Sequence, residues 1–138
     1  MVEIESIGGD GKSFIEEINA ILDANAEARG FPFDTVPVNL RAADETGAFL
    51  GGLSGYGEQG WMYVRFLAVV PAARGLGIGR ALLGRVEAIA RERGLAGVYL
   101  DTYRFEAPDY YPRLGYAEIG RLPAIDGAMP RIWYCKTL

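Results

Sequence analysis

Residues 69–83 read VVPAARGLGIGRALL, and this stretch decides the fold. Gly75, Gly77 and Gly79 alternate with apolar residues between an apolar run and a segment with helical periodicity. The apolar residues of that segment recur on one helical face, and they are Leu82, Leu83, Val86, Ile89 and Ala90. Gly94 follows and predicts the end of the helix. The pattern predicts a strand, a short glycine turn and a helix.

The glycine turn has two interpretations. It could be a packing turn, or it could be a cradle in which free backbone amides and the flanking Arg74 and Arg80 hold a pyrophosphate. A P-loop is excluded, because Gly79 is followed by Arg80 and Ala81 rather than by lysine and a hydroxyl residue. The dinucleotide fingerprint is excluded as well, since its third glycine would fall at Arg80 or at Leu82. The glycines alone leave both interpretations open.

The chain before this stretch predicts two kinds of element. Val2–Ile7 alternates apolar and polar residues, which predicts a strand. Ser13 and Glu16 have the spacing of a capping box and open a predicted helix that reaches Gly30. Three further strands are predicted, separated by hairpin connections: Val38–Ala42, Ala48–Tyr56 and Met62–Val70.

The chain after this stretch predicts a strand over Val98–Leu100 and a short helix opened by Pro108 that ends near Gly115. Two more strands are predicted over Tyr116–Leu122 and Arg131–Thr137. A meander followed by a strand–helix–strand crossover implies an α/β fold with a mixed, mostly antiparallel sheet of six to seven strands, flanked by helices. We expect residues 1–138 to form a single domain.

Composition excludes several classes of function. The chain has no histidine, one cysteine and a net charge of −4, so neither a metal site nor a nucleic-acid partner is expected. No apolar run has the length of a membrane span, and the acidic start is unlike a signal peptide, so no membrane partner is expected. The single Cys135 fits a reducing, cytoplasmic setting.

Several motifs together resemble the GNAT superfamily of N-acetyltransferases. Arg74-Gly75-Leu76-Gly77-Ile78-Gly79 fits the family pattern Gln/Arg-x-x-Gly-x-Gly/Ala, and residues 110–116, YYPRLGY, are similar to its Phe-Tyr-x-x-Leu-Gly-Phe segment. Leu67-Ala68-Val69-Val70-Pro71 resembles the fourth strand of the family. Gly51-Gly52 and the run LDTYRFEAP at residues 100–108 resemble a subgroup of small bacterial acetyltransferases.

The resemblance implies that acetyl-CoA is the cofactor. The pyrophosphate would lie on the glycine turn, and the pantetheine arm would lie along Leu67, Ala68 and Val69, within the strand Met62–Val70, like an added strand. That strand and Val98–Leu100, the fourth and fifth of the predicted sheet, would splay apart to admit the arm. A free amide on the fourth strand would polarise the thioester carbonyl. The implied cofactor-binding residues are Leu67, Ala68, Val69, Arg74, Gly75, Leu76, Gly77, Ile78, Gly79 and Arg80.

The resemblance also implies catalytic residues. Tyr111 matches the family tyrosine that protonates the departing sulfur, which a neutral phenol can do. Asp101, at the end of a splayed strand, is the first candidate for the general base, with Glu58 and ordered water as alternatives. Asp101 could instead cap a helix or pair with an arginine. Loop residues 123–130 could border the acceptor pocket.

The activity implied is transfer of an acetyl group to a primary amine by direct attack in a ternary complex. The acceptor would be a small molecule or a peptide, and a homodimer is possible for proteins of this kind. Two alternatives from other classes stay open. One is a module with this fold that binds acyl-CoA without catalysis, and the other is an interaction domain that uses the glycines for packing alone.

Overall fold

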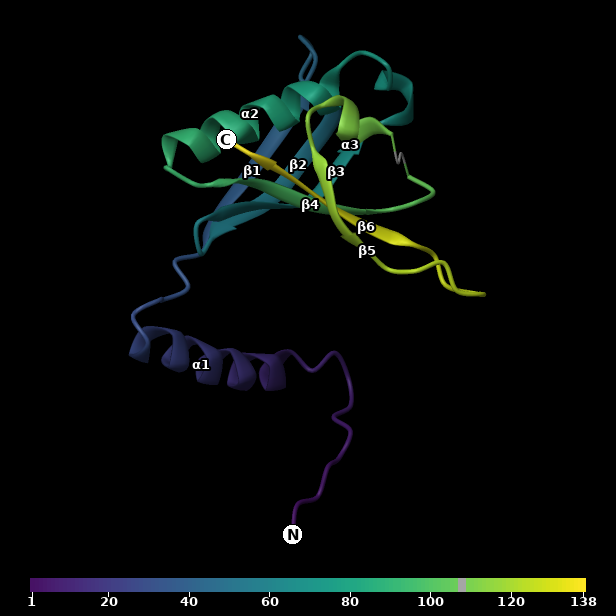
Figure 1. Cartoon of the computed structure of the whole chain (residues 1–138). Helices are drawn as coiled ribbons and strands as arrows, with labels where there is room; N and C mark the ends of the chain where they lie inside the picture. Colours follow the sequence, from purple (N-terminus) through teal and green to yellow (C-terminus); the bar gives the residue numbers. More distant parts are fainter. Residues whose placement is uncertain (107–108) are drawn as a thin grey trace. The chain divides into compact units, whose positions relative to one another are not determined.

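The computed structural model describes residues 1–106 and 109–138 (Figure 1). The chain divides into two compact units, residues 1–34 and residues 35–138, and each is described by itself. The expectation of a single domain stays a prediction. The predicted helix opener Pro108 lies outside the described residues.

The first unit contains one helix, α1 (Lys12–Ala28). The strand predicted over Val2–Ile7 is wrong, because residues 1–8, all of them described, form no regular structure. A strand needs a neighbour to satisfy its backbone groups, and an alternating pattern does not supply one. The predicted capping box is wrong as well. Gly11, with a φ of 67°, precedes the helix, and the Asp10 carboxylate accepts the amide of Lys12 at 3.0 Å.

The second unit is built on a sheet that has six strands within the described residues, in the order β1-β2-β3-β4-β6-β5. All neighbouring strands are antiparallel except β3 and β4, which are parallel. This confirms the mixed, mostly antiparallel sheet, at the lower of the two expected strand counts. The strands are β1 (Val36–Ala43), β2 (Phe49–Glu58), β3 (Trp61–Val69), β4 (Gly97–Tyr103), β5 (Ala117–Arg121) and β6 (Arg131–Thr137).

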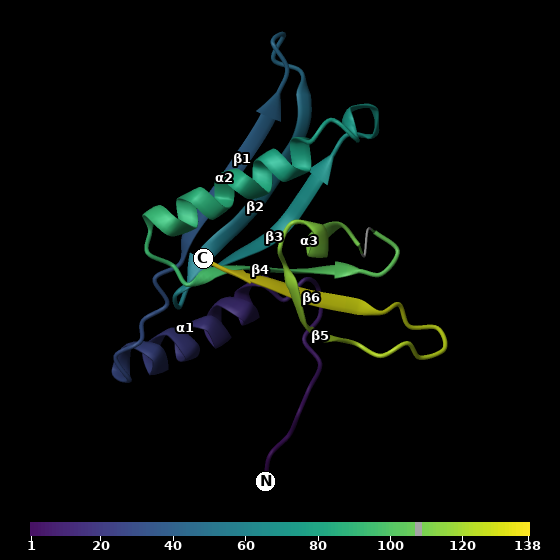
Figure 2. The same cartoon turned by 45° about the horizontal axis from the view of Figure 1, so that its top comes forward.

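Two helices lie on one face of this sheet, α2 (Ile78–Glu92) and the short α3 (Tyr110–Arg113) (Figure 2). The apolar face predicted for α2 is buried against the strands, and Gly94 ends the helix with a φ of 70°. Alternate strand residues face the helix, as the period of a strand requires. The core contains Val38, Leu53, Met62, Val64, Leu82, Leu83, Val86, Ala90, Val98, Leu100, Tyr116, Ile132 and Tyr134.

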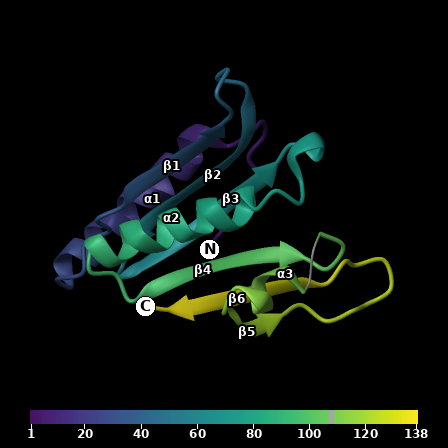
Figure 3. The same ribbon diagram turned by 90° about the horizontal axis from the view of Figure 1, so that it is seen from above.

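Strands β3 and β4 separate partway along their length (Figure 3). Their pairing runs from Met62–Val98 to Val64–Leu100, while β3 continues to Val69 and β4 to Tyr103. Where they part, β3 carries a bulge, since Gly55 of β2 pairs with Val64 and the preceding β2 residue, Ser54, pairs with Phe66. A Cβ on Gly55 would lie 2.0 Å from the Tyr63 carbonyl oxygen, so only glycine fits beside the bulge. The expected splay is confirmed.

Candidate active site

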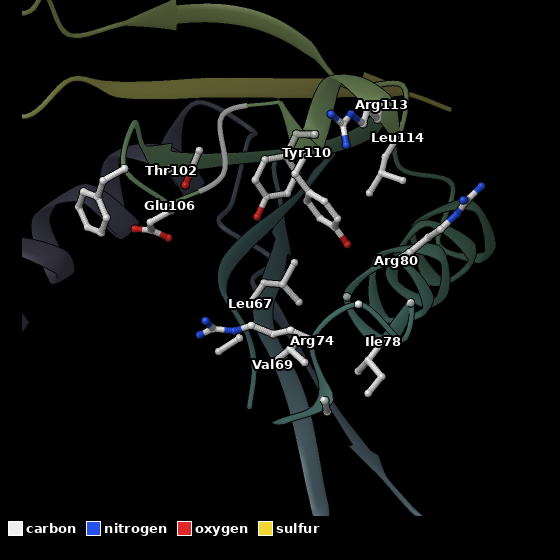
Figure 4. Close-up of a pocket in the computed structure, with 17 residues that line it drawn as sticks. Leu67, Val69, Arg74, Ile78, Arg80, Thr102, Glu106, Tyr110, Arg113 and Leu114 are labelled. Carbon is white, nitrogen blue, oxygen red and sulfur yellow. The ribbon is translucent and has the colours of Figure 1, made fainter. Parts of the chain in front are cut away.

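A cavity of about 900 Å³ lies at the point where β3 and β4 separate (Figure 4). It is bounded by the end of β3, the glycine turn, the first turn of α2, the end of β4 and α3. Its volume is near the upper end of the range for ligand pockets in proteins. The lining residues are Leu67, Ala68, Val69, Ala73, Arg74, Gly75, Gly77, Ile78, Gly79, Arg80, Thr102, Phe105, Glu106, Tyr110, Tyr111, Arg113 and Leu114.

The glycine turn leads from β3 into α2. A short 3₁₀ turn, Pro71–Ala73, follows β3, and Gly75 and Gly77 then adopt left-handed φ angles of 81° and 79°. Gly77 is the N-cap of α2, and no side chain among the described residues caps the helix. The amides of the first turn therefore keep their hydrogen-bonding capacity, and they lie at the positive end of the helix dipole. Such a helix start suits an anion.

Arg74 and Arg80 add positive charge to this end of the cavity (Figure 4). Of the predicted cofactor-binding residues, nine line the cavity, and Leu76 is the exception. Its side chain is 72% exposed. Leu76 can still contribute its backbone amide, which was the part of the residue that the motif implied.

The open edge of β3 forms a second wall. Leu67, Ala68 and Val69 pair with β2 on one side, through Leu53, Gly52 and Gly51. On the other side β4 has already diverged. A Cβ on Gly51 would lie 2.7 Å from the Ala68 carbonyl oxygen, so glycine at position 51 lets β2 approach β3 closely on its paired side. The backbone of β3 can thus accept an extended ligand in the manner of an added strand.

Tyr111 lies on α3 and lines the cavity. Its ring contacts three other tyrosines, with centroids at 5.3 Å from Tyr110, 5.7 Å from Tyr134 and 6.1 Å from Tyr116. Burial, with smaller contributions from Tyr110 and Glu106, raises the pKa of Tyr111 to about 12. The hydroxyl is therefore protonated at neutral pH and can donate a proton.

Tyr110 is a lining residue to which sequence reasoning gave no role. A Cβ on Gly79 would lie 2.7 Å from the Tyr110 hydroxyl oxygen, so glycine at this position makes room for the tyrosine beside the first turn of α2. Thr102, Phe105 and Glu106 were also missed. These four residues belong to the motifs at residues 100–108 and 110–116. A motif, however, does not predict which of its side chains point into the cavity.

Asp101 is not among the described residues that line the cavity. Its neighbour Thr102 lines the cavity, so Asp101 faces the opposite side of β4. One carboxylate oxygen accepts the Tyr63 hydroxyl at 2.6 Å, and the other accepts Nε of Arg131 at 2.7 Å and forms an ion pair with that guanidinium. This is the arginine partner that the sequence left open. The role of Asp101 as a base stays a prediction.

Glu58 lies far from the cavity. It ends β2 and accepts a hydrogen bond from the Thr35 hydroxyl at 2.9 Å. Its pairing partner Trp61 begins β3, whereas the cavity begins six residues later at Leu67. Six strand residues span about 20 Å. In loop 123–130, Ile125 and Ala128 form an isolated bridge, and none of these loop residues is among the described lining.

Within residues 1–106 and 109–138, no cluster of histidine, cysteine and acidic side chains could hold a metal ion. Over the same residues, no helix combines the length and apolar character needed to cross a membrane.

The features that a coenzyme A thioester would need are brought together in this cavity. The helix start with its two arginines suits a pyrophosphate, and the open edge of β3 suits the amides of a pantetheine arm. The residues present therefore fit acetyl-CoA.

Comparisons with known proteins agree with this geometry. The model of the acetyltransferase (GNAT) family matches residues 14–116. An acetyltransferase of Agrobacterium fabrum is 36% identical over 103 residues, which are 75% of each chain. The blasticidin-S acetyltransferase of Streptomyces morookaense is 41% identical over 83 residues, 59% of this chain and 61% of the relative. A crystal structure of an acetyltransferase from Bacillus cereus has a TM-score of 0.83 at 27% identity, covering 99% of this chain and 98% of that chain.

The family match covers most of the chain, and it includes both motifs that carried the resemblance. GNAT acetyltransferases take their acetyl group from acetyl-CoA, so the predicted cofactor and the predicted enzyme class are confirmed. Because the family and the named relatives are acyltransferases, the alternative of an interaction domain is not supported. The chain belongs to the GNAT acetyltransferase family.

Proposed function

We propose that this protein transfers the acetyl group of acetyl-CoA to the nitrogen of a primary amine, by direct attack in a ternary complex. The observation that carries the proposal is the single cavity in which the glycine turn, the open edge of β3 and Tyr111 meet. A site that only bound a phosphate would need the glycine turn, but it would need neither the open edge of β3 nor Tyr111. The half-buried, protonated hydroxyl of Tyr111 in the same cavity adds the means to protonate a leaving group.

The chemistry needs two proton transfers. Acetyl-CoA supplies an activated thioester carbonyl when it is bound. The neutral amine attacks that carbonyl, a nitrogen–carbon bond forms and the carbon–sulfur bond breaks. Tyr111 gives its proton to the departing sulfur, and the attacking nitrogen loses a proton to a base. The free amides of β3 beyond Val64 are the proposed donors to the carbonyl oxygen.

Asp101 is the proposed base, with Glu58 and ordered water as alternatives. Asp101 stands one residue beyond Leu100, where β3 and β4 separate. The Tyr63 hydroxyl, bonded to Asp101 at 2.6 Å, offers a path by which a proton can reach the carboxylate. The distance of Glu58 from the cavity weighs against it.

The base assignment is tested with Asp101→Asn. We expect turnover at neutral pH to fall about 10²-fold while coenzyme A binding is kept, because the amide cannot take a proton. Glu106→Gln is the comparison, since Glu106 carries a carboxylate in the cavity lining. Wild-type turnover in Asp101→Asn together with a large loss in Glu106→Gln would move the role to Glu106.

A small molecule is the proposed acceptor. The support is the relative named for blasticidin S, which is 41% identical over 83 residues. The proposed setting is the cytoplasm, because the single Cys135 suits a reducing compartment.

The function is tested in two steps. Titration calorimetry with coenzyme A comes first, and the absence of heat at high micromolar concentration would overturn the proposal. Release of free thiol from acetyl-CoA is then followed with a panel of primary amines. Turnover with at least one amine is expected. Cofactor binding without turnover on any amine would instead indicate a non-catalytic acyl-CoA-binding module.

A further inference from the structure

A partly buried charged cluster, Glu87, Lys136 and Tyr116, lies between α2, β6 and the start of β5. Glu87 is only 7% exposed although it carries a carboxylate. One of its oxygens accepts the ammonium of Lys136 at 2.8 Å, and the other accepts the Tyr116 hydroxyl at 3.1 Å. The Lys136 ammonium also lies 5.7 Å from the centroid of the Tyr116 ring. The Glu87 carboxylate thus joins Lys136 and Tyr116 at the edge of the core, where Lys136 is partly exposed.

The cluster is hydrogen-bonded to the segment that follows Tyr111, at Leu114 and at Tyr116. The Lys136 ammonium donates a second hydrogen bond, at 3.1 Å, to the carbonyl oxygen of Leu114, directly after α3. The amide of Tyr116 donates to the carbonyl oxygen of Tyr111 at 3.1 Å. The rings of Tyr111 and Tyr116 are also in edge contact. The position of Tyr111 is therefore tied to the cluster through backbone and ring.

Helix α3 cannot hold its own position. It has four residues, and a helix of that length has no stability in isolation. A buried ion pair contributes little net stability, because desolvation of the two charges offsets their attraction. Such a pair does fix the relative positions of the groups that it joins, since its hydrogen bonds are satisfied in one arrangement only. The cluster is better suited to fixing geometry than to stabilising the fold.

We propose that Glu87 and Lys136 are positioning residues that hold Tyr111 at its place in the cavity. Because Glu87 is on α2, the cluster joins the helix that begins at the glycine turn to the helix that carries the proton donor. This inference rests on the proposed function, in which Tyr111 protonates the sulfur. It adds a residue pair that makes no contact with the proposed reacting atoms.

The first test is a double-mutant cycle. Lys136→Met is expected to lower kcat about tenfold while the KM for acetyl-CoA changes less than about twofold, because the glycine turn is untouched. In a Tyr111→Phe background the same substitution should have no further effect on kcat, since the group it positions is gone. An equal loss of kcat in both backgrounds would overturn the proposal. Lys136→Arg, which can keep both hydrogen bonds, should restore most of the activity.

A second variant keeps the test decisive if Lys136→Met alone does not fold. The double variant Glu87→Leu, Lys136→Met removes both charges together, so neither charge is left without its partner. Its kcat should also fall about tenfold in a protein that stays folded, and wild-type kcat would contradict the proposal. The matched control is Glu118→Leu with Arg121→Met, which removes an exposed ion pair on β5 and should leave kcat unchanged.

A third measurement does not depend on turnover, so it separates this proposal from the proposed function. The ring resonances of Tyr111 are assigned by their loss in Tyr111→Phe. They should shift in the Glu87→Leu, Lys136→Met variant and stay in place in the Glu118→Leu, Arg121→Met control. An unchanged Tyr111 ring in the first variant would overturn the positioning role even if no amine were acetylated.

Discussion

The surroundings of Tyr111 suit its side chain to the proposed role as a proton donor. Three neighbouring tyrosine rings hold its ring, and the packing would survive loss of the hydroxyl. The same burial that orients the ring raises the pKa of the phenol to about 12. The hydroxyl thus stays protonated across the neutral range, which a donor to a departing thiolate requires.

Tyr111→Phe separates the hydroxyl from the ring. We expect kcat to fall by about 10²-fold, since the sulfur loses its proton donor, while the Kd for coenzyme A changes less than about threefold. Steady-state assays and calorimetry measure the two quantities. Turnover equal to wild type would remove Tyr111 from the proposed mechanism. A large change in Kd would instead give it a binding role.

At the scale of elements, the start of α2 depends on backbone conformation more than on side chains. Gly77 reaches a φ of 79°, which other residues rarely adopt, and it has open space beside its Cα. A side chain here would stand where a phosphate has to approach the amides. Replacing Gly77 by a larger residue would thus combine backbone strain with obstruction of the proposed anion site.

Gly77→Val should raise the Kd for coenzyme A at least about tenfold and lower thermal stability by a few degrees, because a β-branched residue is strained at positive φ. Gly84→Ala is the matched control. Gly84 lies inside α2 with open space around it, so alanine should leave the Kd unchanged and add about 0.5–1 kcal/mol of stability. Unaltered binding in a folded Gly77→Val protein would contradict the anion-cradle role.

Elements with strong local patterns could be predicted from the sequence, and elements that depend on distant partners could not. Helix α2 has an apolar face at helical spacing, and the residues of that face lie where the pattern predicted them, with Glu87 buried beside them. Val2–Ile7 has the alternation of a strand but no neighbour to pair with, so it forms none. Ser13 has the spacing of a capping residue, yet the N-cap of α1 is the left-handed Gly11, two residues earlier.

The same division applies to the candidate site. Motif residues of the turn and Tyr111 lie in one cavity, and they could be predicted to share a site because the family resemblance implied it. The partners of Asp101 could not be predicted, since Tyr63 and Arg131 come from strands 38 and 30 residues away. The link from Glu87 to Lys136 spans 49 residues and exists only after the sheet and α2 have packed.

At the scale of the whole molecule, tyrosines dominate the response of the fold to pH. The chain has no histidine, so the residue type that ordinarily titrates near neutral pH is missing. Burial raises the pKa of Tyr63 and of Tyr111 to about 12, and it raises that of Tyr116 further, with the Glu87 carboxylate as the next cause. In the unfolded chain the same phenols titrate near 10.

These shifts predict a loss of stability in alkali. A folded-state pKa above the unfolded value means that the folded protein holds its phenol protons more tightly. The resulting stability is fully present below pH 10 and is lost as pH rises through 12. We expect the free energy of unfolding, measured with urea, to be nearly constant from about pH 6 to 9 and to fall between pH 10 and 12. Tyr111→Phe should lose about 2 kcal/mol less over that interval, and an equally steep loss would show that the phenol is solvated in the folded state.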